Sequence, residues 1–141
     1  MTEFAGTRGS HVELMGAEFL DFDPVTETIT MRFVAPDSFI TQRGGVQGGL
    51  VAGFLDEAMG WAHVQATGGA EAPLNLEISM ILLKLIPAGP LMGKGRVVRR
   101  GRRVIFLEGE LWDENWTTLY ARSTSTAIPT PVPGRGNDGA A

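Results

Sequence analysis

Only one segment of this chain, from Gln47 to about Thr67, has the periodicity of a long helix. Its apolar residues recur three and four positions apart, and Gly68-Gly69 stops the pattern. Strand-like segments lie on both sides of it, two before and four after, separated by turn signals such as Pro87-Ala88-Gly89-Pro90. One helix is too few for parallel βαβ units, so the order predicts an α+β fold with the helix packed on an antiparallel sheet.

The predicted elements fill most of the chain. Its 141 residues are enough for one domain with its own core. The segment Pro129 to Ala141 is rich in Pro and Gly, which predicts a disordered tail and assigns the folded domain to residues 1–128. The predicted strands are His11 to Asp23, Glu27 to Ala35, Leu74 to Ile86, Leu91 to Arg100, Arg103 to Trp112 and Thr117 to Ile128.

Composition excludes several classes of function. The chain has no cysteine, so disulfides, thiolate nucleophiles and thiolate metal sites are ruled out, and His11 and His63 are too far apart for a metal motif. We expect neither a metal nor a separate cofactor. A net charge of −4 argues against a nucleic-acid partner. No apolar stretch is long enough for a membrane span and Met1 to Ser10 does not resemble a signal peptide, so we expect a cytoplasmic protein.

The two faces of the predicted helix differ in an unusual way. One is a continuous apolar stripe that can bury against the sheet, made of Leu50, Val51, Phe54, Leu55, Ala58, Met59 and Ala62. The opposite face carries mainly small residues around one carboxylate, namely Gly49, Ala52, Gly53, Asp56, Gly60 and His63. Glycine inside a helix costs about 0.5–1 kcal/mol relative to alanine. Either a second chain or a ligand approaches this face closely, or Asp56 is an ordinary exposed charge among incidental glycines.

A glycine-rich segment, residues 44–49, leads directly into the helix. Free N–H groups at a helix N-terminus favour negative charge, including an oxyanion that develops during a reaction. The segment matches neither the phosphate-loop nor the dinucleotide fingerprint. With Asp56 two turns further on, it supplies a plausible pair of an oxyanion donor and a carboxylate.

Residues 45–60, with the sequence GVQGGLVAGFLDEAMG, resemble the helix motif of the PaaI-like hotdog-fold acyl-CoA thioesterases. The segments 75–78, 83–89 and 96–102 resemble the strand, turn and Gly-Arg strand end that follow in that family. The resemblance implies a hotdog fold, in which about six antiparallel strands wrap around one central helix. It also implies hydrolysis of an acyl-CoA, with coenzyme A as part of the substrate. Homodimers, often paired into tetramers, would hold the active sites at their interface.

The resemblance also implies roles for the helix residues. The Gly48 N–H of one subunit would polarise the thioester carbonyl, and Asp56 of the other would attack that carbonyl or activate a water. Gly49 would border the bound substrate. Gln47 stands where many relatives have His, so we assign it to the polar surroundings of the site.

Outside the helix, Thr41 falls where relatives often place an Asn or Gln that contacts the carbonyl, and Gln42 is one position away. Asn75 falls where relatives have Thr or Ser near the attacking water. We interpret Glu57 as a surface or subunit-contact charge, and His63 as a helix or interface residue. No Ser-His-Asp triad is expected, because neither His has a plausible Ser nearby.

Arginines flank Gly101 between two predicted strands. Arg99, Arg100 and Arg102 are candidates to bind the phosphates of coenzyme A, because the guanidinium fork matches phosphate geometry. The alternative is a solvated hairpin tip.

The acyl group stays open between aryl-acetyl, hydroxylated aromatic and medium-chain groups, with Phe39, Val46 and Met80 as candidates to border it. A non-catalytic acyl-CoA-binding module of the same fold is the main alternative function, and an enoyl-thioester hydratase ranks last.

Overall fold

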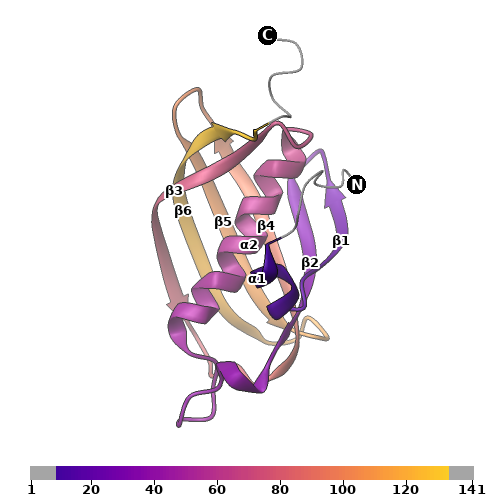
Figure 1. Ribbon diagram of the computed structural model, residues 1–141, viewed down its shortest axis with the longest axis vertical. Coiled ribbons are helices and arrows are strands. Elements are labelled where there is room, and N and C mark those ends of the chain that lie inside the picture. The colour runs from indigo at the N-terminus through magenta and orange to yellow at the C-terminus, as the bar shows by residue number, and fades with distance from the viewer. Residues whose placement is uncertain (1–8, 134–141) are drawn as a thin grey trace.

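A computed structural model describes residues 9–133, and in it one curved six-stranded antiparallel sheet wraps around the long helix α2 (Figure 1). This architecture confirms the predicted α+β hotdog fold. The elements in chain order are α1 (Ser10–Leu14), β1 (Glu18–Asp23), β2 (Thr28–Ala35), η1 (Asp37–Phe39), α2 (Gly48–Ala66), β3 (Glu71–Leu82), β4 (Gly89–Arg100), β5 (Ile105–Asp113) and β6 (Leu119–Pro131).

The strand order β1-β2-β4-β5-β6-β3 leaves two edges of different character. β1 is short and carries the acidic residues Glu18, Asp21 and Asp23, which discourage pairing with another strand. β3 is twelve residues long, pairs with β6 on one side, and has no strand partner on the other side within residues 9–133. Leu74, Leu76 and Ile81 of β3 are each more than half exposed.

The helix lies directly on the middle of the sheet. Its predicted apolar stripe is confirmed, with the side chains of Phe54, Leu55 and Ala58 fully buried. Gly95 of β4 and Gly109 of β5 are register partners beneath the helix, and a Cβ on Gly95 would overlap the backbone carbonyl of Ala58. The glycine pair therefore lets α2 sit close to the strands. No helix within residues 9–133 has the length and apolar character needed to cross a membrane.

Three predicted strands had bounds that were wrong by three residues or more. The strand predicted over Leu74 to Ile86 is β3 and spans Glu71–Leu82. The segment predicted as a strand from His11 begins instead as the helix α1, which ends near Gly16 at a φ of 59°, and β1 starts only at Glu18. β6 continues to Pro131, inside the predicted tail, because Pro129 and Pro131 pair with β3 at the end of the sheet. The rest of that tail, residues 134–141, lies outside the described residues, as do residues 1–8.

Candidate active site

Asp56 lies half-buried on α2 and is held by a side chain from β3. Asn75 Nδ2 donates a hydrogen bond of 2.5 Å to Asp56 Oδ1. The buried Ser125 hydroxyl of β6 donates to Asn75 Oδ1 at 2.8 Å. Because the Asn75 oxygen is engaged by Ser125, its NH₂ group is directed at the carboxylate. The hydrogen bonds from Ser125 to Asn75 and from Asn75 to Asp56 thus fix one carboxylate oxygen, and no described residue donates a hydrogen bond to the other.

A β-bulge directs Asn75 toward the helix. The register between β3 and β6 shifts between Asn75 and Glu77, so Leu76 is an extra residue in β3. Asn75 and Ile78 lie three positions apart and would occupy opposite faces of a regular strand, yet both turn inward here. The bulge therefore permits the contact between Asn75 and Asp56.

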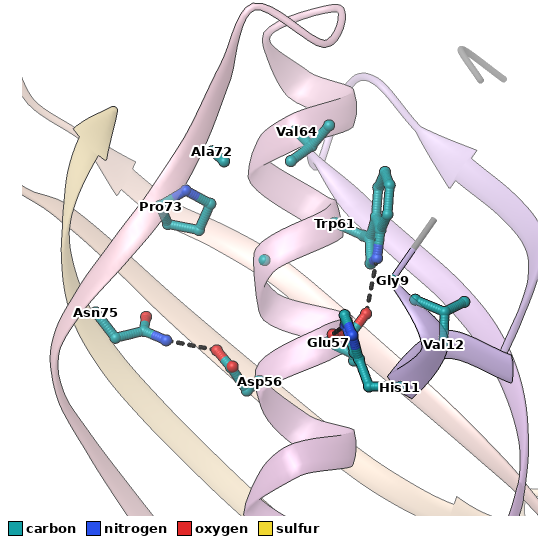
Figure 2. Close-up of a pocket in the computed structure, with 11 residues that line it drawn as sticks. Gly9, His11, Val12, Asp56, Glu57, Trp61, Val64, Ala72, Pro73 and Asn75 are labelled. Atoms are coloured by element: carbon teal, nitrogen blue, oxygen red, sulfur yellow. Dashed lines mark hydrogen bonds and ion pairs between the residues drawn. The ribbon is translucent and has the colours of Figure 1, made fainter. Parts of the chain in front are cut away.

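Asp56 and Asn75 stand at one end of a groove of about 260 Å³, which we call the α2 groove (Figure 2). Asp56, Gly60 and Val64, four residues apart on α2, line its floor. On one side lie Ala72, Pro73 and Asn75 of β3, and on the other lie Gly9, His11, Val12, Glu57 and Trp61. Most of these side chains are apolar, so the groove joins a carboxylate to an apolar channel.

Glu57, predicted as a surface or subunit-contact charge, lies in this groove with only 13% of its side chain exposed. Its Oε1 lies 2.8 Å from His11 Nε2, and its Oε2 accepts from Trp61 Nε1 at 2.9 Å. Sequence reasoning missed this His11 contact because it placed His11 on a strand, where no periodicity connects it with α2. The carboxylate is thereby committed to fastening α1 onto α2.

The start of α2 has free donors. Gln47 is the N-cap, and its Oε1 accepts from Leu50 N at 2.9 Å. No described residue accepts from the N–H of Gly48 or Gly49, and a Cβ on Gly48 would meet nothing within 4 Å. Such a helix start favours an oxygen with partial negative charge.

Other predicted site residues do not meet Asp56 within one chain. Thr41 folds its own loop, since its hydroxyl donates to the Gly45 carbonyl at 3.1 Å, and Gln42 is exposed in the same loop. Phe39 and Val46 are buried in the core, and neither these two nor Met80 line the α2 groove.

The arginines lie in the β4–β5 hairpin, at the end of the sheet beside the last turns of α2 (Figure 1). Arg100 forms a two-pronged pair with Glu27, with both distances at 2.8 Å. Arg99 and Arg102 are exposed and available to an anionic ligand.

His63 was placed on the outer face of the helix, and the structure corrects this. Its side chain is fully buried, and Nε2 lies 3.3 Å from Glu71 Oε1. Burial lowers the pKa of His63, and the nearby Glu71 only partly opposes that effect. Among residues 9–133, no three His, Cys, Asp or Glu side chains are arranged to hold a metal ion.

A family model described as the thioesterase superfamily matches residues 44–119, more than half of the chain, including Gly48, Asp56 and Asn75. The chain belongs to the thioesterase superfamily. This membership makes it a thioester hydrolase and confirms the hotdog thioesterase family that its sequence resembles. No curated protein matches the chain significantly.

Solved structures support the same fold. A phenylacetic acid degradation-related protein from Ralstonia eutropha JMP134 is 26% identical, with a TM-score of 0.80 over 87% of this chain and 92% of that one. The E. coli PaaI protein is 13% identical, with a TM-score of 0.75 over 86% and 85% of the two chains. A protein from Streptococcus mutans UA159, solved with acetyl-CoA bound, is 19% identical, with a TM-score of 0.70 over 82% and 89%. Because their identity is low, the last two show only that the fold is shared.

Proposed function

We propose that this thioesterase hydrolyses acyl-CoA and that Asp56 is its catalytic carboxylate. The observation that carries the proposal is a half-buried carboxylate, fixed by Asn75, at the end of a mainly apolar groove. Such a groove suits an acyl chain, and the carboxylate stands where the thioester carbon would lie. The acetyl-CoA bound to the similar Streptococcus mutans protein supports coenzyme A as the carrier.

The free oxygen of Asp56 has two possible uses. As a general base it takes a proton from water, whose oxygen bonds to the carbonyl carbon while the carbon–sulfur bond breaks and coenzyme A leaves as a thiolate. As a nucleophile its oxygen bonds to the carbonyl carbon while the carbon–sulfur bond breaks and coenzyme A leaves as a thiolate, and water then opens the resulting acyl-aspartyl anhydride to the free acid and the Asp56 carboxylate. A pre-steady-state burst of thiol release ahead of free acid indicates the nucleophilic route. ¹⁸O found in Asp56 after a single turnover in ¹⁸O-water proves that route where water opens the anhydride at the aspartyl carbon.

We infer that Gly48, as the oxyanion donor, serves the Asp56 of a second chain. Gly48 and Asp56 are eight residues apart on one helix, which is about 12 Å along its axis. The carbonyl oxygen and carbon of a thioester are directly bonded. One carbonyl therefore cannot contact the Gly48 N–H and the Asp56 carboxylate of the same chain at once. A homodimer that brings the partner's helix start to Asp56 solves this, and it would bring the partner's Gly49 and Gln42 to the same place.

β3 is the edge through which we expect the two chains to pair. It is long, its outer side is unpaired among the described strands, and its exposed leucines favour burial. Pairing of two β3 strands about a two-fold axis would join the two sheets into one. The family resemblance extends this to a dimer of dimers, which sedimentation equilibrium would measure directly.

The first experiment measures thiol release from a panel of acyl-CoAs. Asp56→Asn keeps the shape of the side chain, and we expect it to lower kcat by about 10²–10⁴-fold. Asp21→Asn, exposed on β1, is the matched control and should retain full activity. An enzyme that binds acyl-CoA without releasing thiol would instead be the non-catalytic binding module.

The second experiment tests Gly48. Gly48→Pro deletes the N–H at the first helical position, where proline fits, and Gln47 already has the ψ of 135° that a residue before proline prefers. Loss of one oxyanion donor lowers kcat by about 10²–10³-fold, whereas Gly48→Ala keeps the donor.

Mixing the Gly48→Pro and Asp56→Asn chains then tests the shared site. Random dimers regain about a quarter of the wild-type sites if each site draws on both chains. No recovery on mixing, after exchange of subunits has been verified, would contradict a site shared between subunits.

A further inference from the structure

We propose that α1, fastened to α2 through His11 and Glu57, is a wall that limits the size of the acyl group in the α2 groove. The acyl group would extend from Asp56 over Gly60 toward Val64. This inference rests on the proposed acyl-CoA substrate and adds the residues that select its acyl part.

Two neighbouring stripes on α2 carry the argument. Gly53, Glu57 and Trp61, four residues apart, form the stripe that meets α1 and the residue after it. Met15 Cε would lie 3.1 Å from a Cβ on Gly53, and His11 binds Glu57. The next stripe, Asp56, Gly60 and Val64, forms the floor of the groove, with Asp56 and Gly60 half-buried and Val64 buried at its far end. The position of α1 on the first stripe thus sets the width of the groove above the second stripe.

Gly60 has no side chain and so leaves the middle of the groove open. A Cβ built there meets only Pro73 Cγ, at 3.8 Å, which is ordinary contact. A side chain at residue 60 would therefore fit the fold and fill the groove. Alanine would be the better helix former by about 1 kcal/mol, so the glycine is explained by the space it leaves.

The lining selects an uncharged acyl group of limited size. Val12, Trp61, Val64, Ala72 and Pro73 present apolar surface. Both oxygens of Glu57 are already engaged, so this carboxylate does not offer itself to a ligand. The volume of about 260 Å³ is just below the range of about 300–1,000 Å³ for sites that hold drug-sized ligands. The floor from Asp56 to Val64 is about 12 Å long.

The fastening of α1 depends on few contacts. α1 has only five residues, and His11 reaches Glu57 from an exposed position, with 57% of its side chain accessible. Val12 is buried beneath it. Removal of the His11 ring should therefore loosen the wall without removing the apolar anchor of α1.

The test uses S-alkyl thioethers of coenzyme A of increasing chain length, which cannot be hydrolysed, and measures their binding by calorimetry. Gly60→Val should weaken the affinity for the longest analogue that the wild type binds. We expect this loss of affinity to be at least tenfold larger than the loss for the methyl thioether, because one methylene group changes pocket discrimination by about 10–200-fold. His11→Ala should extend binding to longer chains. Glu13→Ala, exposed on the same helix, is the matched control and should leave the length profile unchanged. Thermal unfolding of each variant verifies the fold.

The outcomes separate the two proposals. An unchanged length profile in Gly60→Val, equal effects of His11→Ala and Glu13→Ala, or failure of every thioether to bind would overturn the assignment of the wall. Thiol release from acyl-CoAs is measured in parallel on the wild type. Shifted length profiles without any thiol release would confirm the wall and refute hydrolysis, so failure of one proposal is distinguishable from failure of the other.

Discussion

Replacing Asn75 with alanine tests whether Asp56, the proposed catalytic carboxylate, is held by β3. The substitution removes the amide that donates to Asp56 Oδ1 at 2.5 Å and leaves α2 untouched. It also removes the acceptor of the Ser125 hydroxyl, which can turn to its second neighbour, the Glu77 carbonyl at 3.0 Å. The perturbation therefore falls on the orientation of Asp56.

The size of the effect follows from the bond that is lost. A hydrogen bond to a charged group contributes about 1.5–3 kcal/mol, which corresponds to about 10- to 150-fold in rate if the bond is needed in the transition state. Ser125→Ala removes a neutral bond one step further away, of about 0.5–1.5 kcal/mol, and should cost about 2- to 12-fold. We expect kcat to fall in the order Asp56→Asn, Asn75→Ala, Ser125→Ala, with the largest loss first.

Steady-state thiol release supplies kcat and KM for each variant, with the exposed Asn115→Ala as the matched control. A double-mutant cycle adds the decisive measurement: if Asn75 acts through Asp56, Asn75→Ala should have little further effect on kcat in the Asp56→Asn background. Additive losses, or a kcat for Asn75→Ala within twofold of wild type, would refute the positioning role.

Three further predictions concern the rest of the chain. Gly95→Ala should lower the free energy of unfolding by about 3 kcal/mol and Tm by about 10 °C, because its Cβ meets the backbone of Ala58 rather than a movable side chain; a smaller loss in thermal unfolding would contradict the close packing. Since burial lowers the pKa of His63 below its ordinary 6.5, the unfolded state binds more protons below that pH, and stability should fall as pH drops through 6.5, by at most about 1.4 kcal/mol per pH unit. Urea titrations should show a flatter pH dependence for His63→Gln than for the wild type. Arg102→Ala should raise KM for acyl-CoA at unchanged kcat and leave KM for acyl-pantetheine unaltered; an equal change for both substrates would exclude phosphate binding.

The long helix and the six strands were predictable because their signals are local. The helix was predicted over 47–67 and spans Gly48–Ala66, since a regular apolar stripe and two glycines define its ends. Strand number followed from the turn residues between apolar runs. The beginning of the chain had neither signal: five residues of α1 are too few to show a helical period, and alternation in the following β1 appeared to continue through them.

The surroundings of Asp56 could be predicted only in part, because they depend on contacts between distant segments. Asp56 stood out as a lone carboxylate among small residues. The bond from Asn75 depends on a bulge in β3, which shifts the alternation by one residue and leaves no distinct mark in the sequence. His11 and Glu57 are 46 positions apart, and no periodicity relates them.

The glycines on the outer face of α2 now have separate physical reasons. Gly53 allows Met15 to approach, since a Cβ there would lie only 3.1 Å from Met15 Cε. Gly60 leaves the floor of the groove open. Gly48 faces open space at a helix start with free donors. Gly53 and Gly60, inside the helix, each cost about 0.5–1 kcal/mol of helix stability relative to alanine, so this helix is less stable than its length permits. The cost is recovered at the opposite face, where fully buried Phe54 and Leu55 each contribute about 1.5–3 kcal/mol by leaving water. One helix can therefore hold the core together on one face and still leave room on the other for α1, for the proposed acyl group and, in the proposed homodimer, for the start of the partner's helix.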